Sequence, residues 1–124
     1  MKTVRVFKTA WFAKAAAKAR ISDLALCRAF AQVLQGQVDD LGGGVYKKRL
    51  LNNQHRAILL TRLRQAWIYE YVFAKNDRNN IDDAELTGFR LLAKNYSALT
   101  ADQLQALIAN QQFQEICHDH PSQT

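Results

Sequence analysis

The hydrophobic residues of this chain change their spacing twice along its length. Apolar side chains recur at helical spacing between residues 10 and 34, and at the spacing of strands between residues 45 and 74. Helical spacing returns after residue 82. Because a chain that alternates between these periods buries its apolar stripes by packing helices on a sheet, the pattern indicates an α+β protein.

Helix caps and turn residues place the individual elements. In chain order we expect a strand at 3–8, helices that begin at Ala10 and Ser22, a glycine-rich loop at 39–44, strands at 45–51, 57–61 and 66–74, and helices at 82–98 and 100–112. We predict an antiparallel sheet, made of the N-terminal strand and the three-stranded meander, packed against the two N-terminal helices. On the last strand of the meander, Trp67, Tyr69, Tyr71 and Phe73 alternate, so we expect all four on one face.

The length of 124 residues suits one domain. We expect this domain to span residues 1–116, with two added C-terminal helices at about 82–112, and a flexible tail at 117–124. No run approaches the roughly 20 apolar residues that cross a bilayer. The first residues are charged and alternating, unlike a secretory signal. We therefore expect a cytoplasmic protein without a membrane partner.

Cys27 and Cys117 lie some ninety positions apart in the sequence. Two distant cysteines do not form the closely spaced framework of a small secreted domain. We expect Cys27 to be a small apolar residue on a helix, with a bridge to Cys117 as the less favoured alternative.

The positive charge is concentrated in the first two thirds of the chain. Residues 1–78 contain 15 of the 17 Lys and Arg residues but only 5 of the 11 acidic residues, and the whole chain has a net charge of +6. Such a surface favours polyanions such as nucleic acid, an anionic membrane or an acidic protein. An ordinary solvated basic face would give the same composition.

Cationic and titratable residues recur where the meander strands begin and end. They are Lys47, Lys48 and Arg49 on the first strand, His55 and Arg56 at the start of the second, and Lys75 and Arg78 after the third. In an antiparallel meander, the end of one strand lies beside the start of the next. We therefore expect these side chains to meet on one exposed surface and to bind phosphate groups.

A phosphate-binding surface of this kind can also cut RNA, because RNA carries its own nucleophile, the 2′-hydroxyl. Cleavage needs in-line geometry, proton transfer and stabilisation of the charged phosphorane, which Arg and Lys can supply. No metal and no cofactor is expected. Alternatives remain for single residues: the basic strand could be merely solvated, and His55 could be an ordinary loop residue. Tyr71 could stack on bases, although its strand pattern favours core packing.

Four stretches together resemble a bacterial branch of the RelE/ParE toxin superfamily: residues 4–12 (VRVFKTAWF), 42–49 (GGGVYKKR), 55–56 (HR) and 73–83 (FAKNDRNNIDD). The resemblance covers nearly the whole chain and implies a small RelE-like fold. It implies that Lys47, Lys48, Arg49, Arg56 and Lys75 contact the scissile phosphate. Arg62, Arg78, Asn79 and Tyr71 are the expected RNA contacts, and His55 is the candidate acid or base. Asn76 stands where RelE toxins have an arginine, which leaves the general base unassigned.

The resemblance also implies an activity and partners. RelE-like toxins cleave messenger RNA, typically on the ribosome, and so inhibit translation. A cognate antitoxin silences them, and the complex is expected to bind operator DNA through the antitoxin. Because ParE-like relatives poison DNA gyrase without cutting RNA, a gyrase poison remains an alternative, as does a non-catalytic antitoxin-binding module.

Overall fold

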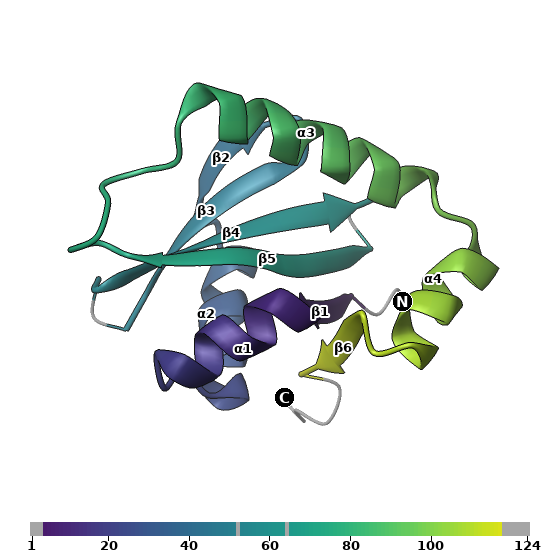
Figure 1. The fold of residues 1–124 in the computed structure, drawn as a ribbon, viewed down its shortest axis with the longest axis horizontal. Helices are drawn as coiled ribbons and strands as arrows, with labels where there is room; N and C mark the ends of the chain where they lie inside the picture. The colour runs from purple at the N-terminus through teal and green to yellow at the C-terminus, as the bar shows by residue number, and fades with distance from the viewer. Residues whose placement is uncertain (1–3, 52, 64, 118–124) are drawn as a thin grey trace.

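The computed structural model describes residues 4–51, 53–63 and 65–117, which form one mixed sheet with helices on both faces (Figure 1). In chain order the elements are β1 (Arg5–Thr9), α1 (Ala10–Lys18), α2 (Asp23–Leu34), β2 (Asp39–Gly42), β3 (Val45–Leu50), β4 (His55–Arg62), β5 (Ala66–Ala74), α3 (Asp83–Ala98), α4 (Ala101–Ala109) and β6 (Phe113–Ile116). The predicted α+β fold class is confirmed, as are all four helices.

The helices begin where the sequence provides a capping side chain. Thr9 and Ser22 each accept a hydrogen bond from the backbone three residues on, at the starts of α1 and α2. Asp82 and Thr100 form complete capping boxes at α3 and α4. These local bonds satisfy N–H groups that the first helical turn leaves without partners. Because the capping residues are visible in the sequence, they predict closely where each helix starts.

The sheet has the strand order β2-β3-β4-β5-β1-β6. Strands β2 to β5 form an antiparallel meander, and β6 pairs antiparallel with β1. Strand β1, however, pairs with β5 in the parallel direction, so the prediction of a wholly antiparallel sheet is wrong at this position. Two strands were also missed, β2 in the predicted loop and β6 after α4, because both are short and lie at the edges of the sheet.

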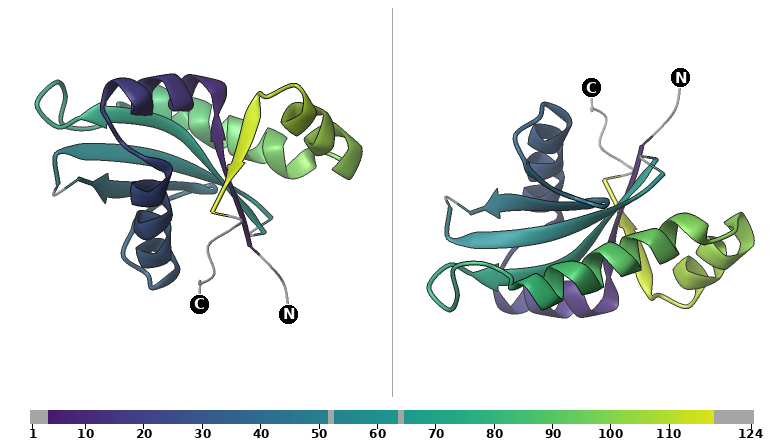
Figure 2. Two further views of the ribbon diagram at one scale, coloured as in Figure 1. Left: turned by 90° about the horizontal axis from the view of Figure 1, so that it is seen from below. Right: turned by 90° about the horizontal axis from the view of Figure 1, so that it is seen from above.

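The helices divide the core into three clusters. On one face, α1 and α2 pack against residues of β1, β4 and β5, around Phe12, Leu26 and Leu59. On the opposite face, α3 packs against Val45, Ile58 and other residues of the meander. Helix α4 and β6 cover the remaining end of that face. Figure 2 shows α2 and α3 on opposite sides of the sheet. The meander is therefore buried on both faces along most of its length.

A bulge in β5 overturns the prediction that its four aromatic residues share one face. The neighbouring residues Ile58 and Leu59 of β4 pair with Tyr71 and Tyr69, so Glu70 is an extra residue in β5. One extra residue reverses the alternation of every side chain beyond it. Tyr69 consequently packs against α1 and α2, whereas Tyr71 packs on the side of α3.

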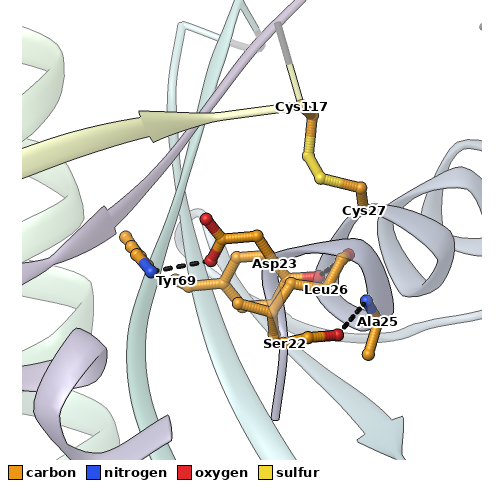
Figure 3. Close-up of a disulfide and its surroundings, with 8 residues drawn as sticks. Ser22, Asp23, Ala25, Leu26, Cys27, Tyr69 and Cys117 are labelled. Atoms are coloured by element: carbon orange, nitrogen blue, oxygen red, sulfur yellow. Dashed lines mark hydrogen bonds and ion pairs between the residues drawn. A yellow bond between two sulfur atoms is a disulfide. The ribbon is translucent and has the colours of Figure 1, made fainter. Parts of the chain in front are cut away.

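A disulfide joins Cys27 of α2 to Cys117, directly after β6, and corrects the expectation that the two cysteines are unbridged (Figure 3). The pairing of β6 with β1 brings Cys117 to the α2 side of the sheet, where the Cα atoms of Cys27 and Cys117 lie 5.5 Å apart. Cys117 is thus fixed in place, while residues 118–124 of the predicted flexible tail lie outside the described residues.

Candidate functional site

The ends of the meander strands meet as the sequence predicted. Arg49 of β3 pairs with Arg56 of β4, which in turn pairs with Phe73 of β5. The backbone N–H of Lys75 donates a hydrogen bond of 2.9 Å to the carbonyl oxygen of Gln54. The backbone positions of Arg49, Arg56 and Lys75 therefore lie at one end of the sheet.

The side chains of this group are divided between the two faces of the sheet. Lys47, Arg49 and Arg56 lie on the α3 face, because their cross-strand partners or alternating neighbours belong to the α3 cluster. Lys48 and His55 lie on the α2 face, opposite Ala57 and Leu50 of the α2 cluster. A lysine-lysine-arginine run on a strand must alternate in this way. The expected single surface is therefore made by only part of the set.

Arg49 and Arg56 form the centre of the basic surface on the α3 face. Directly opposed residues of an antiparallel pair have Cβ atoms roughly 5 Å apart, and two like charges in that position repel each other. The Nη1 atom of Arg56 donates hydrogen bonds to the carbonyl oxygens of Asn53 and His55, at 3.0 and 3.3 Å. Among the described residues, neither arginine forms an ion pair with a carboxylate. An anion bound between them would relieve the repulsion.

Arg78 extends this surface beyond β5. Its guanidinium lies over the ring of Phe73, 5.6 Å from the centroid, and donates to the Tyr71 hydroxyl at 3.3 Å. Glu85 accepts two further hydrogen bonds from the same guanidinium, which raise the pKa of Arg78 and lower that of Glu85. Arg78 is therefore held firmly, and Glu85 offsets part of its charge.

Asn80 is a contact that the sequence did not predict. Its side-chain oxygen accepts a hydrogen bond of 3.3 Å from Nζ of Lys47 and one of 2.9 Å from the backbone N–H of Ile81. It thereby connects the loop after β5 to β3. The chosen neighbour, Asn79, is exposed. Only the fold could distinguish the two, because adjacent asparagines in a loop carry the same local signal.

Lys48 differs most from its expected environment. Its side chain was expected to face solvent, but the residue is only 6% exposed. Burial lowers the pKa of Lys48, and the neighbouring positive charge of Arg49 lowers it further. His55 is half-buried on the same face, and its Nδ1 atom is buried without a hydrogen-bond partner among the described residues.

Three other candidates are separated from the arginine pair or engaged in packing. Arg62 lies at the opposite end of β4, about 20 Å from Arg56 at the usual rise per residue, and donates to the carbonyl oxygen of Leu99. Lys75 is exposed in the turn after β5. Tyr71 stacks on the exposed Trp11 of α1, with ring centroids 5.1 Å apart, so the packing alternative applies to it.

The family comparison agrees with this architecture. Residues 4–116 match the family model described as the RelE toxin of the RelE / RelB toxin-antitoxin system. The chain belongs to the RelE family. As a RelE family member it is the toxin component of a toxin–antitoxin system, and the family implies a cognate antitoxin partner.

No curated protein and no solved structure gives a significant match to this RelE family chain. In the described part of the chain, no helix is both long and apolar enough to span a bilayer. The same residues contain no cluster of three or more His, Cys, Asp or Glu side chains that could bind a metal ion.

Proposed function

We propose that this RelE family toxin is an endoribonuclease that cleaves messenger RNA on the ribosome and inhibits translation. The observation that carries the proposal is the opposed pair Arg49 and Arg56, with Lys47 two residues before Arg49 on the same face. Three cations at adjacent sheet positions, with no carboxylate ion-paired to them among the described residues, suit the phosphodiester backbone of RNA.

The proposed reaction uses the nucleophile that RNA provides. The 2′-oxygen bonds to the adjacent phosphorus and loses its proton, while the bond from phosphorus to the 5′-oxygen breaks and that oxygen gains a proton. The products are a 2′,3′-cyclic phosphate and a 5′-hydroxyl end. Arg49 and Arg56 would bind the non-bridging oxygens, where negative charge accumulates in the transition state. This route requires no metal ion.

The division of side chains between the faces narrows the predicted catalytic set. On the α3 face we retain Lys47, Arg49 and Arg56, with Arg78 and Asn80 as positioning residues. Lys48 and His55 lie on the other face, so we do not assign them a step in this reaction. The cognate antitoxin would inhibit the toxin by covering the arginine pair, and the complex would reach operator DNA through the antitoxin.

The test compares Arg56→Ala with Arg20→Ala. Both remove an exposed or half-exposed arginine, but Arg20 lies between α1 and α2, outside the meander. Each variant is expressed in bacteria, and transcript ends are mapped. We expect Arg56→Ala to reduce cleavage inside coding regions by about 10²–10³-fold, the usual loss for one transition-state donor, and Arg20→Ala to leave it unchanged.

Two outcomes would contradict the proposal. Cleavage that is equally fast in the wild type and in Arg56→Ala would remove the site from the arginine pair. DNA damage with intact messages would favour the gyrase-poison alternative. Purified variants with the same circular dichroism spectrum and unfolding midpoint exclude misfolding as the cause of lost cleavage.

A further inference from the structure

A second basic site lies on the other face of the sheet, between α2 and the outer edge of β3. A cavity of about 670 Å³ opens there, with apolar residues such as Ile21, Ala29 and Leu50 forming part of its wall. A second hollow of about 470 Å³ adjoins it and shares Lys48 and Arg49 with it. The first volume falls within the range of small-molecule sites.

The edge of β3 is open at this point, which explains why the cavity exists. Strand β2 pairs with β3 only as far as Lys47, so the following residues of β3 have no neighbour on that side among the described strands. Helix α2 passes over this edge and contacts β3. Lys48 and Arg49 therefore line a hollow at the unpaired part of this edge.

Lys48 is the unusual residue of this cavity. It is more than nine-tenths buried, lines both hollows, and has no hydrogen bond or ion pair with the described residues. Because its Nζ atom has no hydrogen-bond partner among the described residues and is not sealed from solvent, the ammonium group can bind an anion that enters the cavity. Arg28 and Arg49 line the same cavity, and none of its described lining residues is acidic.

We propose that the cavity between α2 and β3 is a binding site for a phosphate group, with Lys48 at its centre and Arg28 and Arg49 at its rim. The amide side chains of Gln32 and Asn53 also line it and can donate to phosphate oxygens. Three cations around one compact cavity suit a doubly charged phosphate better than the single charges of an acidic peptide.

Two sources could supply this phosphate: a free mononucleotide or the backbone of RNA. The second source rests on the proposed nuclease function. It is supported by the position of Arg49, which lines this cavity and is also the cross-strand partner of Arg56 on the cleavage face. An RNA strand that passes round the open edge of β3 would contact both sites.

The site can be tested on the whole chain with inorganic phosphate as the probe, followed by calorimetry or NMR. We expect Lys48→Met and Arg28→Gln each to weaken phosphate binding at least tenfold. Lys14→Met, a change of an exposed lysine on α1, should leave binding unchanged. Because Arg28 is exposed on α2, its variant should fold normally even if the Lys48 variant does not.

A non-cleavable 2′-O-methyl oligoribonucleotide distinguishes the two sources. Competition between it and phosphate would show that the site binds RNA, whereas independent binding would assign the site to free nucleotides. Phosphate binding that survives in Arg56→Ala but fails in Lys48→Met supports the site even if no nuclease activity is found. Three results would overturn the proposal. They are a wild-type protein that does not bind phosphate, phosphate binding by Lys48→Met as tight as that of the wild type, and Lys48-dependent binding of polyglutamate but not of phosphate.

Discussion

The disulfide between Cys27 and Cys117 should contribute a large part of the stability of this toxin. The bridge closes a loop with a sequence separation of 90 residues. The chain-entropy relation gives about 4.6 kcal/mol for a loop of that length, and measured bridges commonly contribute about 2–4 kcal/mol. A domain of this size has a free energy of unfolding of about 5–15 kcal/mol. We therefore expect the Cys27→Ser, Cys117→Ser double variant to lose about 2–4 kcal/mol.

Urea unfolding with and without a reducing agent measures this contribution. Reduced wild-type protein should unfold at the same midpoint as the double variant, and the reductant should not affect the variant. Each single serine variant should match the double variant, because either change removes the bridge. Equal midpoints for oxidised wild type and double variant would refute the reasoning, since the cross-link would then place no constraint on the unfolded chain.

Three further changes test the packing around the site. Tyr69→Phe removes a buried hydroxyl that donates to a carbonyl oxygen of α2 at 2.7 Å and should cost about 1–2 kcal/mol in urea unfolding. Burial raises the pKa of Glu70 above its ordinary value of 4.5, although a hydrogen bond from Tyr96 opposes the shift. Stability should therefore fall as the pH rises from 4.5 through the raised pKa of Glu70 in the folded protein. Glu70→Gln should remove this dependence, and a variant with an unchanged pH profile would contradict the prediction. Gly44→Ala should lower the melting temperature, because φ is +84° and the new Cβ would lie 3.2 Å from that of Ala93; an unchanged melting temperature would contradict the predicted strain.

The sequence alone determined the elements that depend on local interactions. The helix starts followed from capping residues such as Thr9 and Ser22, whose bonds reach only three residues along the chain. The strand of residues 66–74 followed from its alternating aromatic residues, and its observed bounds are those predicted. The order of the meander also predicted that Lys75 lies near the start of β4, because a hairpin must reverse the chain, and the backbone hydrogen bond from Lys75 to Gln54 agrees with this.

The tertiary structure decided which side of the sheet each candidate residue occupies. The bulge at Glu70 places Tyr69 and Tyr71 on opposite faces of the sheet. No local sequence pattern predicts this bulge, because it depends on the pairing between β4 and β5. The burial of Lys48 is likewise set by α2, which packs across the sheet from an earlier part of the chain. The sequence shows which residues are basic and how they are spaced, but only the packing of the fold determines which of them share a surface.

The bridge between Cys27 and Cys117 is a further feature that the sequence made possible and the tertiary structure decided. The sequence supplies the two thiols, but their meeting depends on β6 pairing with β1 at the far edge of the sheet. Such pairing is a non-local contact whose register is set by the buried side chains of both strands. Residue type and period therefore determined the parts of this toxin, whereas contacts distant in sequence determined how its basic residues are divided into two surfaces.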